Sequence, residues 1–188
     1  MSSRIVIERI ATEESLRVGA TATDLAAVGQ FASASRRSEV LAWRAIVRRV
    51  LGESVEIFYD ENGAPKVDCP DTYISVSHSR DMVAVLFADR ACAVDIESSE
   101  RDFGKVVSRY LSEKEQYIAE EKDLYAEMWS AKEALYKYYS KGSLDLVRDI
   151  SIVEYNAETG MLIATILGGA PIEVTVKREG NLVIALID

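Results

Sequence analysis

A change from helical to strand-like periodicity, which occurs twice, is the feature that most restricts how this 188-residue chain can fold. Residues 40–51 and 123–140 place apolar side chains at helical spacing, and short strand-like runs follow each segment. The offsets between matching segments are 95 to about 99 residues, which is too long for a solenoid. The pattern predicts an α+β chain of two similar halves, each a long helix followed by an antiparallel sheet. The alternative is that any two α+β segments look alike at this level.

Two pairs of segments support the repeat. Residues 55–59 have a counterpart at 150–155, and the hairpin around residue 78 has one at 174–185. We place the boundary between the halves after residue 97, which gives units 1–97 and 98–188. A cleft between two such halves is a frequent place for a small-molecule site.

The remaining elements follow from local signals. We expect Ser35 or Ser38 to cap the first long helix and Gly52 to end it, and we expect Ser112 and Glu115 to form a capping box. The other expected elements are a strand at 5–10, a weak helical region at 13–33 broken at two glycines, a polar loop at 78–81 between strands 73–77 and 82–87, a strand at 91–97, and strands at 149–155, 161–167, 172–177 and 181–187.

Composition excludes several classes of protein. The formal net charge of −9 makes broad nucleic-acid binding unfavourable, because phosphate neutralisation needs a basic surface. No run of eighteen apolar residues exists to span a membrane, and the first residues lack the apolar core of a signal peptide. Two cysteines and one histidine give neither a disulfide framework nor a zinc cluster. A cytoplasmic protein is the expectation.

Asp95 and Glu97 are separated by one residue in an expected strand, so both carboxylates project from the same face. Neighbouring carboxylates repel each other unless a cation compensates them, and Mg²⁺ prefers oxygen ligands. A solvated strand end is the plainer interpretation of the pair.

A third carboxylate, Glu133, lies in the helix 123–140. Trp129, Lys132, Glu133 and Lys137 are spaced to share one helix face, where a carboxylate could bind metal and the lysines could meet phosphate. A surface ion pair between Glu133 and Lys137 is the alternative.

Arginines concentrate on the first long helix of an otherwise acidic chain. Arginine matches phosphate geometry, so these side chains favour a phosphate-rich ligand, although a solvated basic face is an equal alternative. They are Arg36, Arg37, Arg44, Arg48 and Arg49. His78, in the expected loop, could contact an anion or simply be exposed.

Three ordered segments together resemble the 4′-phosphopantetheinyl transferase family. They are NGAP at 62–65 with ISVSHS at 74–79, AVDIE at 93–97, and WSAKEALYK at 129–137. The arginine-bearing helix is similar to that of the Sfp-type members. This resemblance implies transfer of 4′-phosphopantetheine from coenzyme A to a serine of an apo acyl or peptidyl carrier protein, with release of adenosine 3′,5′-bisphosphate. It also implies an intramolecular pseudo-dimer that acts as a monomer, with its site between the halves.

The resemblance implies roles for individual residues. Asp95, Glu97 and Glu133 would bind Mg²⁺, with Mn²⁺ as a substitute, and Glu133 would be the general base. Lys137 would stabilise charge on the leaving group. The implied coenzyme A contacts are Arg36, Arg37, Arg44, Lys66, Ser77, His78, Asp95, Lys132 and Lys137.

One departure concerns the segment after Gly63. Many relatives have Gly-Lys-Pro where this chain has Gly63-Ala64-Pro65, so Lys66 is the candidate replacement for the missing lysine. Two further functions stay open. One is a non-catalytic module that binds coenzyme A or a carrier protein, and the other is a metal-dependent phosphohydrolase.

Overall fold

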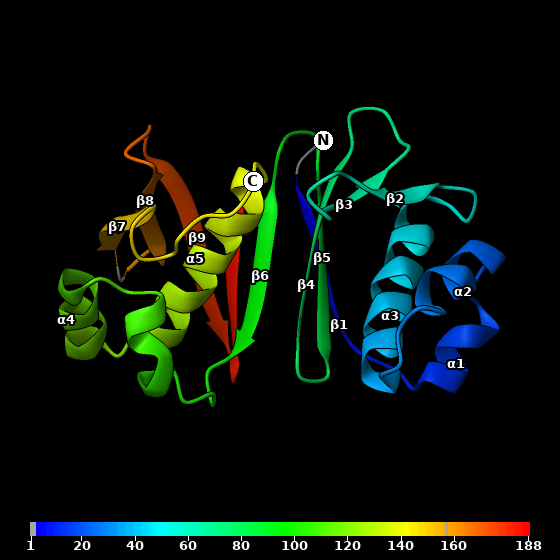
Figure 1. Ribbon diagram of the computed structural model, residues 1–188, viewed down its shortest axis with the longest axis horizontal. Helices are drawn as coiled ribbons and strands as arrows, with labels where there is room; N and C mark the ends of the chain where they lie inside the picture. The colour runs from blue at the N-terminus through cyan, green and yellow to red at the C-terminus, as the bar shows by residue number, and fades with distance from the viewer. Residues whose placement is uncertain (1–2, 157) are drawn as a thin grey trace. The chain divides into compact units, whose positions relative to one another are not determined.

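The computed structural model describes residues 3–156 and 158–188 and divides the chain into two compact units, Met1–Arg90 and Ala91–Asp188 (Figure 1). The boundary that we expected after residue 97 falls inside strand β6 (Ala93–Ser98). Because β6 pairs with β10 (Leu182–Ile187) along its whole length, it belongs to the second sheet.

The sheet of the first unit has three antiparallel strands in the order β1-β5-β4. They are β1 (Arg4–Arg9), β5 (Met82–Ala88) and β4 (Tyr73–Ser79). A separate hairpin joins β2 (Ile57–Tyr59) to β3 (Pro65–Val67). The turn of this hairpin is closed by Asp60, whose Oδ1 accepts hydrogen bonds from the backbone of Asn62 and Ala64.

Three helices complete the first unit: α1 (Glu13–Val18), α2 (Ala22–Val28) and α3 (Ala34–Leu51). The weak helical region is indeed interrupted at Gly19 and Gly29. The expected cap of α3 at Ser35 or Ser38 is wrong, because Ser33 Oγ accepts the backbone N–H of Arg36 and the helix starts earlier. Gly52 ends the helix as expected, with a φ of 108° that suits glycine.

The second unit contains a five-stranded antiparallel sheet in the order β6-β10-β9-β8-β7. Its other strands are β7 (Ile150–Asn156), β8 (Met161–Ile166) and β9 (Ile172–Glu179). The helical segments are η1 (Gly104–Arg109), α4 (Glu113–Lys122) and α5 (Tyr125–Tyr139). The predicted capping box of Ser112 and Glu115 starts α4.

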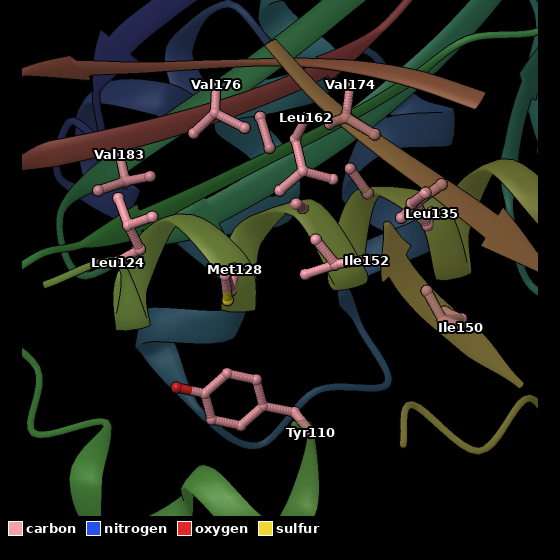
Figure 2. Close-up of a cluster of buried hydrophobic side chains, with 14 of the residues drawn as sticks. Tyr110, Leu124, Met128, Leu135, Ile150, Ile152, Leu162, Val174, Val176 and Val183 are labelled. Atoms are coloured by element: carbon pink, nitrogen blue, oxygen red, sulfur yellow. The ribbon is translucent and has the colours of Figure 1, made fainter. Parts of the chain in front are cut away.

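Helix α5 lies across one face of this sheet (Figure 1). Figure 2 shows side chains of α5, Tyr110 and strands β7–β10 in one apolar cluster. Met128, Leu135 and Val174 in this cluster are fully buried. Burial of side chains of this size stabilises a fold by about 1.5–3 kcal/mol each. The packing therefore fixes the rotation of α5 about its own axis, and with it the positions of its polar side chains.

The two units repeat one order of elements. In each, an edge strand is followed by shorter helical segments, a long helix and four further strands. The sheet orders β1-β5-β4 and β6-β10-β9 also correspond, and the hairpins β2–β3 and β7–β8 occupy the same place in the chain. The expected α+β class with antiparallel sheets is confirmed. The packing of the units as a pseudo-dimer stays a prediction. Within the described residues, no helix is both long and apolar enough to cross a membrane.

Candidate functional site

Strand β6 and helix α5 together position a group of charged side chains in the second unit. Asp95 and Glu97 alternate with apolar residues along β6, opposite Ala185 and Val183 of β10. Two residues apart in a strand, they extend from one face of the sheet. Asp95 is buried, with 6% of its surface exposed, whereas Glu97 lies nearer to the end of the strand.

Lys137 joins the last turn of α5 to β6. Its Nζ donates to Asp95 Oδ1 at 2.8 Å and to the carbonyl oxygen of Val94 at 3.0 Å. A charge-assisted hydrogen bond of this length in a partly buried place is stronger than a neutral one. The pair therefore places an ammonium group beside the Asp95 carboxylate.

Glu97 makes a second ion pair. Its Oε2 accepts from Arg101 Nη1 at 2.6 Å, and its Oε1 accepts the backbone N–H of Ser98 at 2.8 Å. The guanidinium carbon of Arg101 lies 4.7 Å from the ring centre of Trp129 and 5.4 Å from that of Phe103. Trp129 is thus linked to the carboxylates through Arg101, which stacks on its ring and pairs with Glu97.

Glu133, on α5, is half-buried and faces like charges. Burial raises the pKa of its carboxyl above the usual glutamate value, and the charge of Asp95 raises that pKa further. Lys137 and Arg101 oppose the rise, and Glu97 adds to it. The charges of Asp95 and Glu97 both act on Glu133, so the three carboxylates are electrostatic neighbours. A carboxylate of this kind holds a proton more readily than an exposed one, as a general base must.

The donor set of this group suits a hard divalent cation. Three carboxylates offer the oxygen ligands that Mg²⁺ takes, and the mutual repulsion that raises the pKa of Glu133 would be relieved by a divalent cation. In the side-chain arrangement of the described residues, however, no three acidic, histidine or cysteine side chains are gathered closely enough to bind a metal ion. Asp95 and Glu97 are turned to Lys137 and Arg101 instead. The residues fit the metal in chemistry, and ligation would require these side chains to turn.

The shared helix face that we expected for Lys132, Glu133 and Lys137 is wrong for Lys132. Consecutive residues of a helix are about 100° apart around its axis, so the side chains of Lys132 and Glu133 point in different directions. Its ammonium is fully buried and donates to Glu115 Oε2, the carbonyl oxygen of Leu146 and that of Ile150, at 2.8 to 2.9 Å. All three N–H donors of Lys132 are used inside the unit. Its role in binding coenzyme A stays a prediction that would require this network to open.

In the first unit, two of the predicted residues come together. Arg36 Nη1 lies 2.7 Å from His78 Nε2, and it also bonds to Glu39 Oε2 at 3.0 Å. His78 belongs to strand β4, so the expected loop at 78–81 is wrong and the turn contains only Arg80 and Asp81. Almost half of the Arg36 side chain is exposed, which leaves the guanidinium accessible to a ligand.

Two other predicted arginines are engaged within the fold. Arg44 is 3% exposed, and its Nε donates to the buried carboxylate of Asp24 at 2.6 Å. Arg37 bonds to Glu13 and to the carbonyl oxygens of Phe31 and Ala32. Both side chains join helices of the first unit. Their contact with phosphate stays a prediction.

Lys66 and Ser77 lie on strands of the same unit. Lys66, on β3, pairs with Asp60 at 3.4 Å and is partly exposed, so its ammonium group remains accessible. Ser77, on β4, has a buried side chain. Neither position tests the expected coenzyme A contact.

Sequence reasoning missed Arg101 as a member of the carboxylate group. A cation four residues after Glu97 is a signal on a helix, but β6 ends between them and the chain turns. The aromatic residues Phe103 and Trp129, which hold the guanidinium, come from different segments. Only the folded chain brings these three side chains together.

The segment that contains this carboxylate group matches a known family. A model described as the 4′-phosphopantetheinyl transferase superfamily matches residues 91–187, which is just over half of the chain and nearly all of the second unit. Among curated proteins, no match to the chain was found.

Proposed function

Because the chain belongs to the 4′-phosphopantetheinyl transferase superfamily, we propose that it transfers 4′-phosphopantetheine from coenzyme A to a serine hydroxyl of an apo acyl or peptidyl carrier protein. The superfamily consists of transferases, so carrier proteins and coenzyme A are the expected partners. The observation that carries the proposal is the group of Asp95, Glu97, Glu133 and Lys137, all within the matched segment.

The chain is proposed to be an Sfp-type member that acts as a monomer. The support is the repeated order of elements, with a long helix and four following strands in each unit. A single chain with two such units has the elements that a dimer of one-unit chains would have.

Glu133 is the proposed general base. The serine oxygen forms a bond to a phosphorus of the coenzyme A pyrophosphate, and the bond from that phosphorus to the bridging oxygen breaks. The serine proton passes to Glu133, whose raised pKa favours accepting it. Adenosine 3′,5′-bisphosphate leaves with the bridging oxygen and its negative charge.

Two groups neutralise charge in this step. The ammonium group of Lys137 is held beside Asp95. In this position it can stabilise charge on the leaving phosphate. Mg²⁺, or Mn²⁺ in its place, bound by Asp95, Glu97 and Glu133 would supply further neutralisation of the phosphate oxygens when present. Positioning and electrostatic stabilisation of this kind dominate catalysis of phosphoryl transfer.

Arg36 and His78 are proposed to bind phosphates of coenzyme A. Both lie on the first unit, where Arg36 Nη1 donates to His78 Nε2 at 2.7 Å. The guanidinium of Arg36 keeps further donors for an anion, and the His78 ring can donate from Nδ1. Many relatives have a lysine at the position of Ala64. Lys66 is proposed to take the place of that lysine, because its ammonium group is partly exposed.

Conversion of an apo carrier protein by the pure enzyme tests the proposal. With coenzyme A and Mg²⁺, a panel of carriers should include at least one whose mass increases by one phosphopantetheine. Glu133→Ala should abolish the conversion, since a positioned base contributes roughly 10²–10⁴-fold in rate and the same residue is a proposed ligand. Glu120→Ala, which removes an exposed glutamate on α4, is the matched control and should remain active.

The outcomes separate this function from its competitors. Full activity of Glu133→Ala would contradict the assigned base. Binding of coenzyme A with no product on any carrier would favour a non-catalytic binding module. Release of phosphate or nucleotide without a carrier would favour a metal-dependent hydrolase.

A further inference from the structure

Both carboxylate oxygens of Glu97 are already engaged by groups of this chain. Arg101 Nη1 donates to Oε2 at 2.6 Å, and the backbone N–H of Ser98 donates to Oε1 at 2.8 Å. The Glu97 side chain is 14% exposed, so little water competes for these oxygens. A metal ion that binds Glu97 must therefore share a carboxylate oxygen with the Arg101 guanidinium or with the Ser98 backbone N–H.

Aromatic rings hold the guanidinium of Arg101 in this place. It lies over Trp129 of α5 at 4.7 Å and over Phe103 at 5.4 Å, and the two rings contact each other with their centres 6.0 Å apart. Phe103 and Tyr110, which also contacts Trp129, are buried. A cation over two aromatic faces is attracted by both rings in addition to its ion pair. Arg101 is thus more firmly placed than an ordinary surface arginine.

From these contacts we propose that Arg101 is an internal counter-ion of Glu97 that competes with a divalent metal ion for the carboxylate group. The inference rests on the proposed metal site of Asp95, Glu97 and Glu133. Arg101 supplies a positive charge at Glu97, as Lys137 does at Asp95, and it lowers the affinity of the group for a metal ion.

Competition and an orienting role have opposite effects on the affinity for the metal ion. An outer hydrogen bond that merely orients a metal ligand raises metal affinity, and its loss costs 10–100-fold. Arg101 instead carries a full positive charge within 2.6 Å of a ligand oxygen, and that charge repels a divalent cation at the same carboxylate. Removing a unit charge about 5 Å from a divalent ion in a water-like medium changes binding by about tenfold. Removal of Arg101 should therefore tighten metal binding.

Titration of the pure protein with Mn²⁺, followed by electron paramagnetic resonance without coenzyme A or carrier, measures this effect. Arg101→Gln should lower the Kd for Mn²⁺ by about tenfold. Lys105→Gln is the matched control, because it removes a positive charge from the same segment but its ammonium pairs with Asp102. This control should change the Kd by less than about twofold, since exposed charges at a distance are screened by salt.

A double-mutant cycle tests whether the competition takes place at the Glu97 carboxylate. In a Glu97→Gln background, Arg101→Gln should have a much smaller effect on the Kd, because the contested carboxylate is gone. Equal effects in the two backgrounds would overturn competition at Glu97. Unchanged or weaker Mn²⁺ binding in Arg101→Gln would overturn the proposal as a whole.

The failure of this proposal is distinguishable from failure of the proposed metal site. Glu133→Gln should weaken Mn²⁺ binding strongly if the site is correct. If it does not, the metal site and the competition both fail. If Glu133→Gln weakens binding while Arg101→Gln leaves it unchanged, only the role of Arg101 is overturned.

Discussion

Glu133 is placed where its charge is unfavourable. Its carboxyl is half-buried, and Asp95 and Glu97 add negative charge to its surroundings, so its pKa is raised above that of an ordinary glutamate. The same surroundings that make it a better base therefore make the folded protein less stable when Glu133 is ionised. Functional sites commonly oppose stability in this way.

This opposition predicts that Glu133→Gln stabilises the protein while it abolishes transfer. Neutral glutamine removes both the repulsion and the cost of burying a charge, with an expected gain of about 1 kcal/mol in the free energy of unfolding near pH 7. Chemical unfolding in urea, followed by circular dichroism, measures it. Glu120→Gln on the exposed face of α4 should leave the free energy of unfolding unchanged.

The direction in which the free energy of unfolding changes with pH gives a second test of this prediction. A carboxyl with a raised folded-state pKa binds its proton more tightly in the folded chain, so stability falls as pH rises through the interval from the unfolded to the folded value. The gain of the glutamine variant should therefore be full above that interval and should disappear below the ordinary glutamate pKa. A gain that increases toward acidic pH would contradict the assignment.

At the scale of elements, each unit joins a short helix to its long helix through a buried acid. Asp24 completes a capping box with Thr21 and accepts from Arg44 and Arg48 of α3. Glu115 completes the capping box of Ser112 and accepts from Lys132 of α5. In both units, the acid that caps the short helix also forms an ion pair with the long helix that follows. The repeat therefore includes the ion pair that attaches the long helix.

The second of these connections gives a prediction for stability. Lys132→Met should destabilise the protein by about 3–5 kcal/mol, because it leaves Glu115 buried without its cation. Glutamine can still serve a capping box, so the double variant Lys132→Met, Glu115→Gln should recover much of this loss. Thermal and urea unfolding measure both changes. A loss below 1 kcal/mol in the single variant would mean that the buried pair contributes little.

The elements were predictable from the sequence where the signal is local. The alternation of β6, the capping box at Ser112 and the end of α3 at Gly52 need only neighbouring residues, and the structure has all three. His78 was misplaced because a polar residue in a strand resembles a loop residue when the paired strand is unknown. The burial of Lys132 was not predictable, because its three oxygen partners come from α4 and from two positions after α5.

The candidate site was predictable to a similar extent. Spacing alone places Asp95 and Glu97 on one face of a strand and Glu133 and Lys137 on one face of a helix, and motif resemblance joins the two groups. Their mutual electrostatics and the ion pair of Lys137 with Asp95 depend on how α5 packs against β6, which no local pattern specifies. The same holds for Arg101, whose two aromatic neighbours are brought to it by the fold.

At the scale of the whole molecule, the repeated topology allows the charged positions of the two units to be matched. Glu97 is paired with the second residue of β10, and Glu8 is paired with the second residue of β5. By the same register Val6 of β1 takes the place of Asp95. The first unit therefore has one acid on its edge strand where the second has two, and that acid pairs with Arg49 at 2.5 Å.

This difference predicts one divalent metal site per chain, formed by the second unit. Titration with Mn²⁺ should saturate at one ion per chain, because the strand β1 has a valine where a second ligand would be needed. Glu8→Gln should leave the stoichiometry unchanged and the Kd within about twofold, since the charge of an exposed carboxylate is screened by salt and already paired with Arg49. Glu97→Gln removes the matching acid of the second unit and should weaken binding strongly. Two ions per chain, or a loss of binding in Glu8→Gln equal to that in Glu97→Gln, would show that both units retain a metal site. The repeat would then be functional as well as structural.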